Sequence, residues 1–271
     1  MSKDKIVLIT GASSGIGLAA ARFFSARGYR VFGTSRKLGG SAPQGYEMIQ
    51  LDVTNDESVK AAVDEVIRKA GRIDVLINNA GFGIAGAGEE SSMTQAKSLF
   101  ETNVFGLIRM IQAVLPVMRA QGAGRILNVS SILGKVPAPF MALYASTKHA
   151  IEGYSESLDH EVRQFNVRSI LIEPGMTKTQ FEGNSIEADS HLVIYQTNRQ
   201  RFFETMKVSM SLGDSPDVVA AVMLKAVEDP KPRLRYTAGK QAKDVSLLRR
   251  FAPETVFDAL FRKQMKIDAS A

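Results

Sequence analysis

The sequence predicts an α/β protein built on one doubly wound, parallel sheet of about seven strands, with helices on both faces. Short apolar runs alternate along the chain with longer segments of helical period. Most of these runs lack the apolar–polar alternation of a half-exposed sheet, so both faces of the sheet should be covered. A glycine-rich turn follows the first run directly, which is typical of a strand–turn–helix unit.

The strands follow one another at regular intervals. They are predicted at 5–10, 29–35, 47–53, 73–79, 125–130 and 167–174, with a last edge strand at 232–239. The first connecting helix, over 18–27, should end at Gly28, because glycine accepts the left-handed backbone that often closes a helix.

Two further helices carry recognisable start signals. Thr54 and Glu57 have the spacing of a capping box, which opens a helix that runs to Gly71. Ser215 stands before Pro216, and a serine N-cap followed by proline is a favourable helix start. The intervening segments therefore read as the helices that cover the sheet.

We expect a single domain over 1–271. The 271 residues are 45% hydrophobic and 23% charged, which is ordinary for a globular protein with a buried core. Cysteine is absent, which excludes disulfides and thiolate metal sites, and we expect no metal ion. The first apolar run is too short to cross a bilayer and leads into the glycine turn, so we expect a cytoplasmic protein.

The chain is basic, with a formal net charge of +6. One interpretation is attraction to phosphate-bearing molecules or an acidic surface; the other is a solvated surface with excess lysine and arginine. The basic residues are not accompanied by a series of aromatic side chains that would stack on bases, so we expect no nucleic-acid partner.

The glycine turn after the first strand has the features of a dinucleotide site. Glycines allow a sharp turn and a close approach to a pyrophosphate, and the following helix offers free N–H groups. A structural turn is the alternative, but the position between strand and helix is that of a Rossmann fingerprint. The expected contacts are Gly11, Ser13, Ser14, Ile16 and Gly17.

The end of the second strand favours NADP over NAD. An acidic residue that binds the ribose 2′-hydroxyl is missing there, and Ser35 and Arg36 stand in its place. The planar guanidinium of Arg36 suits a 2′-phosphate, although a solvated loop charge is the alternative. Asp52 and the Val53 backbone, after the third strand, are expected beside the adenine; a capping role is the other interpretation of Asp52.

Several short motifs together resemble the short-chain dehydrogenase/reductase family, over nearly the whole chain up to the helix after Pro216. They are TGASSGIG at 10–17, NNAG at 78–81, Asn103 in a helix, NVSS ending at Ser131, YASTK from Tyr144 to Lys148, and EPGMTKT at 173–179. Each motif alone is weak or moderate, whereas their order and separation are specific. The resemblance implies a Rossmann fold and a nicotinamide-dependent oxidoreductase.

The residue types suit the interconversion of a carbonyl and an alcohol, which moves a hydride and a proton. A tyrosine has a pKa of about 10, so Tyr144 acts best as acid and base near neutral pH if its pKa is lowered. Lys148 lies four residues later on the same helical face, and its charge, with that of oxidised nicotinamide, favours the tyrosinate. Ser131 ends a strand, where its hydroxyl can orient the substrate oxygen.

The resemblance implies further roles. Lys148 would also hold the ribose hydroxyls of the nicotinamide, and Asn103 would position a water linking Lys148 to solvent. Thr177 and Thr179 would contact the pyrophosphate and the carboxamide. The remaining cofactor contacts expected at strand ends are Asn79, Ala80, Gly81, Pro174 and Gly175.

The segment 181–212 corresponds to the family's lid over the substrate pocket. It is rich in apolar residues, and the loop after Ser131 adds more, so we expect a hydrophobic ketone, aldehyde or secondary alcohol as substrate. Packing of the lid on the core is the alternative. The residues concerned are Phe181, Leu192, Tyr195, Phe202, Phe203, Met210, Leu133, Val136, Phe140 and Met141.

A C-terminal helical extension is expected over 240–271. Its length and basic character loosely resemble the 17β-hydroxysteroid and retinol dehydrogenase branch, which suggests a steroid or retinoid substrate. Its apolar residues would bury in a partner subunit or on the body rather than on a membrane. We expect a homodimer or homotetramer.

Two other functions fit the same fold. A non-catalytic NADP sensor or scaffold is the first alternative, but such proteins typically lose the tyrosine or the lysine, and this chain keeps both. A sugar-nucleotide epimerase also uses tyrosine and lysine, but it normally has a longer chain and a differently spaced glycine turn.

Overall fold

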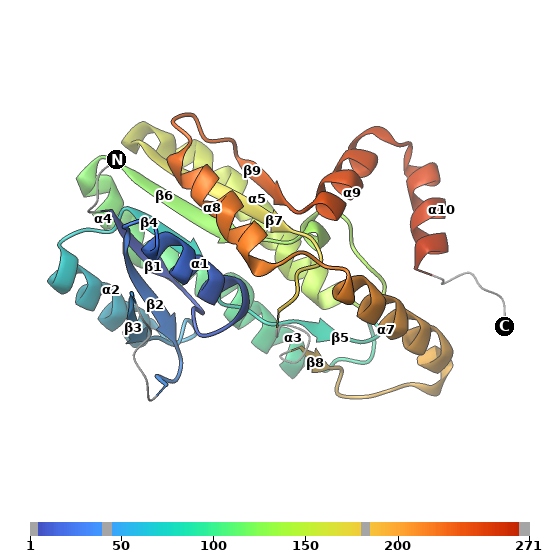
Figure 1. The fold of residues 1–271 in the computed structure, drawn as a ribbon. Coiled ribbons are helices and arrows are strands. Elements are labelled where there is room, and N and C mark those ends of the chain that lie inside the picture. The colour runs from blue at the N-terminus through green and yellow to red at the C-terminus, as the bar shows by residue number, and fades with distance from the viewer. Residues whose placement is uncertain (1–4, 40–44, 180–184, 266–271) are drawn as a thin grey trace.

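The computed structural model describes residues 5–39, 45–179 and 185–265. Its centre is a seven-stranded sheet in the order β3-β2-β1-β4-β6-β7-β9 (Figure 1). Every neighbouring pair of strands in this sheet runs parallel. The predicted doubly wound α/β fold is confirmed.

Six of the seven strands lie within the predicted segments, and β6 begins one residue before its segment. The seven are β1 Ile6–Ile9, β2 Arg30–Ser35, β3 Glu47–Gln50, β4 Val75–Asn78, β6 Gly124–Val129, β7 Val167–Pro174 and β9 Arg235–Ala238. A second sheet consists of two short parallel strands, β5 Ile84–Ala85 and β8 Ile186–Glu187.

Helices follow most strands along the chain. The α-helices are α1 Gly15–Ser25, α2 Asp56–Ala70, α3 Met93–Phe100, α4 Gly106–Gln121, α5 Ala142–Val162, α7 Gln196–Ser211, α8 Pro216–Glu228, α9 Lys240–Phe251 and α10 Glu254–Gln264. Four short helical turns are η1 Glu101–Phe105, η2 Ile132–Gly134, η3 Arg163–Phe165 and η4 Val193–Tyr195.

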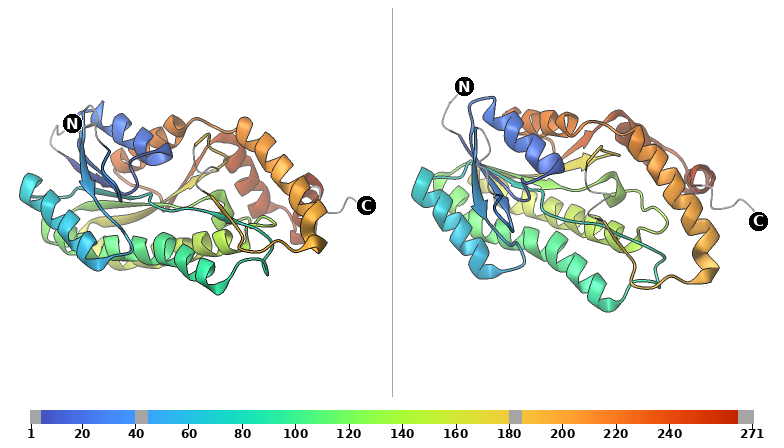
Figure 2. Two further views of the ribbon diagram at one scale, coloured as in Figure 1. Left: turned by 90° about the horizontal axis from the view of Figure 1, so that it is seen from below. Right: turned by 60° about the horizontal axis from the view of Figure 1, so that its bottom comes forward.

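Two apolar layers enclose the sheet. One packs α1 and α8 on the sheet through residues such as Phe24 and Met223, and the other packs α2, α4 and α5 through residues such as Val66, Met110 and Ile151. Figure 2 shows these helices on opposite faces of the sheet. Burial on both faces explains why the strands read as nearly continuous apolar runs.

The helix termini follow the predicted signals in part. The first helix, α1, spans Gly15–Ser25 with Ala26 as its C-cap, so it begins and ends earlier than the predicted 18–27, although Gly28 does have a φ of +83°. Ser215 accepts a hydrogen bond from the Asp217 N–H, and Gly71 closes α2 in the left-handed conformation, both as expected. The capping residue of α2 is Asn55 rather than Thr54, because the Asn55 side chain accepts from the Ser58 N–H at 2.7 Å. The cap lies one residue later than the capping-box pattern indicated.

The segment predicted as a lid contains β8, η4 and α7, and its residue Phe181 lies outside the described residues. β8 pairs with β5, which joins this segment to the chain that follows β4. The extension forms α9 and α10, at the end of the molecule where α7 lies (Figure 1). Within the described ranges, no helix has the length and apolar character needed to cross a membrane.

Candidate functional site

The glycine turn lies at the carboxyl end of β1 and is built for close contact. Gly11 has a φ of +67°, a backbone conformation that favours glycine. A Cβ at Gly17 would lie 2.2 Å from the Gly11 carbonyl oxygen, so only glycine fits there. Ser14 occupies the N-cap of α1 without a side-chain capping hydrogen bond. The first N–H groups of α1 therefore face the turn, as a phosphate site requires.

The end of β4 is attached to this turn by Thr10. Its hydroxyl accepts hydrogen bonds from the Asn79 N–H at 2.9 Å and the Ala80 N–H at 3.0 Å. The Asn79 side-chain amide donates to the carbonyls of Thr10 and Gly11, each at 3.0 Å. Sequence analysis predicted Asn79 and Ala80 at the site but missed Thr10, whose signal is a hydroxyl directly before the turn.

A third segment reaches the turn after β7. The side chain of Thr179 lies 3.3 Å from the position of a Cβ on Gly15, which places Thr179 against the glycine turn. Thr177 is buried, and its hydroxyl donates to the Gly175 carbonyl at 3.1 Å. Gly175 follows Pro174, the last residue of β7, and donates its N–H to Ala238 in β9. The EPGMTKT segment is therefore beside the turn, as expected.

A cleft of about 800 Å³ opens along this side of the turn. Ser13, Ser14 and Thr179 line it, as do three basic side chains that sequence analysis did not select: Arg22, Lys178 and Lys207. A cleft that combines a helix N-terminus with positive charge suits a phosphate group. The sequence signal for Lys178 was its place between Thr177 and Thr179.

Arg36 stands at the end of β2 and is exposed. Among the described residues, no ion pair involves its guanidinium. Asp52 is close to it: hydrogen bonds from the N–H and hydroxyl of Thr54 hold the pKa of the Asp52 carboxyl below its usual value, and the charge of Arg36 adds to this effect. Oδ1 of Asp52 accepts both Thr54 bonds, at 2.9 and 2.7 Å, so the turn-capping role occurs. The adenine role stays a prediction.

The two other residues predicted near the nucleotide differ in exposure. Ser35 is half-buried, and its carbonyl accepts from the Leu51 N–H at 2.9 Å. Val53 is buried, and its side chain lies 2.7 Å from the position of a Cβ on Gly106. Gly106 thus lets the start of α4 approach the end of β3, leaving the Val53 backbone at the edge of the sheet.

Tyr144 and Ser131 meet at the carboxyl end of β6. Tyr144 lies in the first turn of α5, and its hydroxyl forms a hydrogen bond with the side chain of Ser131. Ser131 precedes η2, and its oxygen accepts from the Leu133 N–H at 3.1 Å. That bond orients the serine hydroxyl, so its one proton is free to point toward Tyr144 or a substrate oxygen.

Burial sets the protonation of this pair of helix residues. Desolvation raises the pKa of the Tyr144 hydroxyl above its usual value, although the hydrogen bond with Ser131 acts in the opposite direction. Desolvation lowers the pKa of Lys148 to about 8, against the smaller effect of the Glu152 charge. The net effect of the protein's own groups is therefore to raise the pKa of Tyr144, and the lowering expected from Lys148 is not seen.

Lys148 is held beneath the tyrosine. Its Nζ lies 5.5 Å from the centre of the Tyr144 ring and donates at 2.8 Å to the Val129 carbonyl, the last residue of β6. The spacing of four residues places both side chains on one face of α5, as predicted.

Asn103 lies in η1, a π-helical turn between α3 and α4. Its side chain accepts from the Phe82 N–H at 3.0 Å and donates to the Phe82 carbonyl at 2.9 Å and the Thr147 hydroxyl at 3.2 Å. These bonds join the chain after β4 to α5 and explain an asparagine within a helix. The side-chain amide is occupied by these bonds, and the water expected to link Lys148 to solvent stays a prediction. Gly81 lies next to it: a Cβ there would be 2.9 Å from the Asn103 Oδ1.

The tyrosine faces an apolar wall. Tyr144 packs with Ala85, Ala138, Met141 and Phe202, all buried. Phe202 comes from α7, so the segment predicted as a lid belongs to the same buried cluster as the tyrosine. The partly buried residues packed against this cluster are Leu133, Phe140, Phe203, Met206, Phe261 and Met265.

The remaining residues expected to line the pocket are distributed more widely. Val136 is buried, and Tyr195 packs edge-on against Phe140 with the ring centres 6.4 Å apart. Leu192 is exposed, and Met210 lines the cleft beside the glycine turn. The apolar residues of the segment therefore both line the tyrosine side and cover the cofactor side.

Comparisons with known proteins agree with this geometry. Residues 5–190 match the family model described as short chain dehydrogenase. A 3-ketodihydrosphingosine reductase of Bacteroides thetaiotaomicron is 39% identical over 239 residues, covering 88% of each chain. Retinol dehydrogenase 8 of Bos taurus is 36% identical over 252 residues, 85% of this chain and 80% of the relative.

A solved structure supports the fit of a nicotinamide dinucleotide. ElxO with NADP bound is 27% identical, with a TM-score of 0.72 over 87% of this chain and 97% of that one. The features that fit such a cofactor here are the close backbone of Gly11 and Gly17, the unblocked start of α1 and the basic cleft. The chain is an oxidoreductase that interconverts carbonyl and alcohol groups with NAD(P), and it belongs to the short-chain dehydrogenase/reductase family.

Proposed function

We propose that this protein is an NADP(H)-dependent reductase or dehydrogenase for hydrophobic carbonyl compounds and their alcohols, with Tyr144 as general acid and base. The observation that carries the proposal is the buried hydrogen bond between Tyr144 and Ser131 above Lys148. It places the Tyr144 hydroxyl, the Ser131 hydroxyl and the Lys148 ammonium beside one cluster of apolar side chains. A carbonyl oxygen that accepts from both hydroxyls would be fixed in direction.

Each protein group has a separate task. In reduction, Tyr144 donates its proton to the forming alkoxide, and Ser131 stabilises the negative charge on the same oxygen by a second hydrogen bond. Lys148 places its positive charge under the tyrosine ring and stabilises the tyrosinate left behind. The bound nicotinamide supplies the hydride in reduction and accepts it in oxidation.

The raised pKa of Tyr144 in the free protein bears on which direction of the reaction the residue is ready for. The raised pKa keeps Tyr144 protonated in the free protein, and the protonated form is the one that reduction requires. Oxidation requires the tyrosinate, and the charge of the oxidised cofactor would help to form it. The same residue can therefore act as acid with the reduced cofactor and as base with the oxidised one.

The choice of NADP rests on Arg36. Its guanidinium is exposed at the end of β2, beside Asp52, and without an ion pair among the described residues. A 2′-phosphate would give it a bidentate partner. No acidic side chain stands at Ser35 or Arg36 to accept from a free 2′-hydroxyl, which is the usual basis of NAD preference.

The substrate class rests on the apolar wall. Phe140, Phe202 and Phe203 form an aromatic group in which neighbouring ring centres lie 5.4 to 5.6 Å apart. Phe140 adopts a φ of +57°, a conformation rare for a bulky residue, and its side chain packs against the cluster that contains Tyr144. Such a wall suits a long-chain or polycyclic carbonyl, in line with the sphingoid and retinoid names of two relatives.

A panel of carbonyl compounds tests the reaction. The purified protein is mixed with NADPH and with long-chain ketones, retinoid aldehydes or short water-soluble ketones, and the loss of NADPH fluorescence is followed. We expect turnover with the long apolar compounds. Turnover restricted to the short polar ketones would contradict the substrate class, and no turnover in either direction would contradict the activity.

Tyr144→Phe tests the role of the tyrosine. It should lower kcat by about 10²–10⁴-fold while NADPH affinity stays within about twofold, because only the proton donor is lost. Tyr154→Phe is the matched control, since Tyr154 lies on the same helix but packs against the layer of α2, α4 and α5 and not in the Tyr144 cluster. A Tyr144→Phe protein with parental turnover would overturn the assignment.

A further inference from the structure

A second cleft lies at the opposite edge of the sheet from the tyrosine site. It has a volume of about 500 Å³ and opens at the amino-terminal ends of β6 and β7, next to the loop that leads into β9. Five of its lining residues are basic, and none is acidic. The polar lining consists of Arg125, Arg163, Asn166, Arg168, Lys231 and Arg233.

The sheet itself brings two of these charges together. Arg125 in β6 and Arg168 in β7 are direct partners in the parallel register, so their side chains leave the same face of neighbouring strands. Like charges directly opposite one another destabilise a sheet. The arrangement therefore costs stability unless a counter-charge is present.

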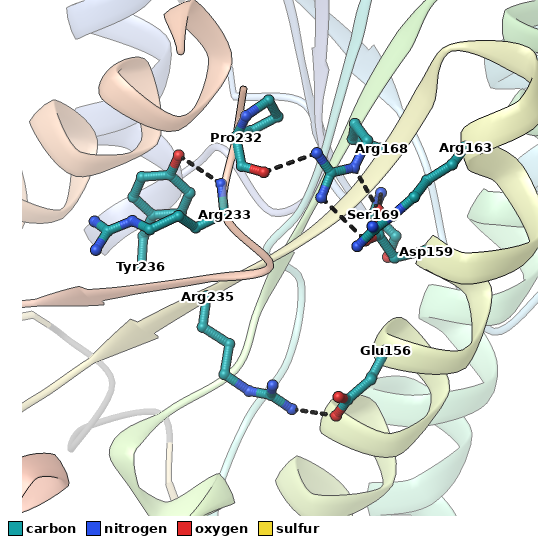
Figure 3. A network of polar contacts seen from close by, with 9 residues as sticks. All are labelled: Glu156, Asp159, Arg163, Arg168, Ser169, Pro232, Arg233, Arg235 and Tyr236. Atoms are coloured by element: carbon teal, nitrogen blue, oxygen red, sulfur yellow. Dashed lines mark hydrogen bonds and ion pairs between the residues drawn. The ribbon is translucent and has the colours of Figure 1, made fainter. Parts of the chain in front are cut away.

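The buried carboxylate of Asp159 supplies a counter-charge to only one side. It accepts from Arg168 Nε at 2.8 Å and Nη2 at 3.0 Å, from Arg163, and from the Ser169 N–H at 3.1 Å (Figure 3). Both of its oxygens are thus occupied. Burial by itself would raise the pKa of Asp159, but the two arginines hold it below its usual value, so the carboxylate stays charged.

Arg125 forms no ion pair among the described residues, although the more distant charge of Asp229 partly offsets that of Arg168. Its Nη1 donates to the Gly124 carbonyl at 2.9 Å, whereas its Nε is buried and meets no acceptor. Desolvation, followed by the charge of Arg168, lowers the pKa of Arg125 below its usual value. A buried donor without an acceptor is costly, so an acceptor from outside would stabilise this side chain.

The walls of the cleft are fixed around these charges. Arg168 donates to the Pro232 carbonyl at 2.7 Å, which holds the loop, and the Asn166 side chain donates to the Gly122 carbonyl at 3.1 Å. Figure 3 shows Arg235 directed away from this group, toward Glu156. Lys231 is exposed at the rim, and no ion pair involves its side chain among the residues that the structure describes.

We propose that this cleft is a binding site for a small molecule that carries a diphosphate or two neighbouring phosphate groups. Arg125 and Arg168 present guanidinium groups from adjacent strands, which suits charge-assisted bonds to phosphate oxygens. Lys231 adds a mobile cation at the rim. The site is separate from the cofactor cleft, and the proposal does not depend on the reaction at Tyr144.

Isothermal titration of the full chain with inorganic pyrophosphate and with ADP tests the proposal. The parent should show a saturable component that weakens with added salt, as bonds between charges do. Arg125→Gln should weaken this component at least about tenfold, because it removes the charged guanidinium and its buried N–H donor. Lys231→Gln should weaken it less, because Lys231 lies exposed at the rim. NADPH affinity should stay unchanged in both. Tighter binding of ADP than of pyrophosphate would identify a nucleotide as the source of the phosphates. Equal binding of the two would identify a diphosphate group without a base as the ligand.

Three matched variants distinguish this site from others. Lys97→Gln removes an exposed charge on α3, and Lys207→Gln removes one from the cofactor cleft; both should leave the component in place. Arg125→Lys keeps the charge without the planar fork and should bind with intermediate affinity. Equal pyrophosphate affinity in the parent and in folded Arg125→Gln and Lys231→Gln proteins would overturn the proposal. So would an acidic peptide that binds the cleft more tightly than pyrophosphate.

Discussion

The Nζ of Lys148 lies 5.5 Å from the centre of the Tyr144 ring and is held there by a 2.8 Å hydrogen bond to the Val129 carbonyl. The lysine is therefore fixed by the sheet, not by the tyrosine itself. Burial gives the two side chains opposite shifts: the pKa of Lys148 falls to about 8, and that of Tyr144 rises. In both cases the neutral form is favoured, as desolvation requires.

The lowered pKa of Lys148 predicts how stability changes with pH. The folded lysine loses its proton near pH 8, whereas the unfolded chain keeps it to about pH 10.4, so unfolding takes up a proton between these values. Raising the pH through this window should stabilise the fold by up to about 1.4 kcal/mol per pH unit from this group alone. Urea unfolding at several pH values, compared with Lys148→Met, measures it. A parent–variant difference that is the same at every pH would contradict the lowered pKa.

Arg36→Asp should reverse the cofactor preference. We expect the parent to bind NADPH at least about tenfold more tightly than NADH, since the guanidinium pairs with the 2′-phosphate. The new carboxylate repels that phosphate and accepts from the 2′-hydroxyl of NADH. Fluorescence titration of both cofactors measures the change, with Lys97→Asp as a surface-charge control. Equal affinities in the parent would refute the role of Arg36.

The centre of the main sheet was predictable because its strands, such as β1, β4 and β7, are buried on both faces and read as apolar runs. The edge strand β9 is buried only at alternate residues, and it was predicted from its position near the end of the series. The shift of the α2 cap from Thr54 to Asn55 has a local cause, since both residue types cap helices and only the backbone decides between them. The strands β5 and β8 have two residues each, too few to produce a periodic pattern.

The motif residues of the site were predictable, but their environments were not. Tyr144, Lys148 and Ser131 meet as their spacing and motif order indicated. The direction in which the pKa of Tyr144 shifts could not be predicted. The tyrosine is buried in a cluster with Phe202, which is distant in the sequence and carries no motif. Thr10 was missed for a similar reason: its importance comes from the two N–H groups that it accepts after β4.

Gly17→Ala should disrupt the cofactor turn. The added Cβ would lie 2.2 Å from the Gly11 carbonyl oxygen, which is backbone, and 2.5 Å from the Asn79 side-chain amide, which two hydrogen bonds hold in place. We expect a loss of about 1–3 kcal/mol of stability, typical of overpacking, and at least about tenfold weaker NADPH binding. Thermal unfolding and fluorescence titration measure the two effects.

Gly153→Ala provides the matched control for that variant. Gly153 is an exposed position in α5 where an added Cβ meets nothing within 4 Å. Alanine should therefore stabilise the protein by about 0.5–1 kcal/mol through its helix propensity, with NADPH affinity unchanged. A Gly17→Ala protein that behaves like Gly153→Ala would show that the turn has room to move.

Glu90→Gln should loosen the segment that covers the tyrosine. Glu90 is buried before α3 and accepts from Arg199 in α7, from the Leu192 N–H at 2.8 Å and from the Ala87 N–H at 2.8 Å. Burial alone would raise its pKa, but these bonds hold the pKa below the usual value, so the carboxylate stabilises the contact above about pH 4.5 and the contact weakens as pH falls.

The neutral amide leaves the Arg199 charge buried without a counter-charge, which costs several kcal/mol, about 3–5 in comparable pairs. Since α7 carries Phe202 to the tyrosine, a weaker attachment should raise KM for apolar substrates more than it lowers kcat, and should speed proteolysis between 190 and 212. Steady-state kinetics and limited proteolysis measure these effects.

Glu89→Gln is the control, because Glu89 is exposed and bonds only the Tyr195 hydroxyl in the described contacts, at 2.7 Å. If both variants keep parental KM and cleavage rates, the Glu90–Arg199 pair does not hold the segment in place.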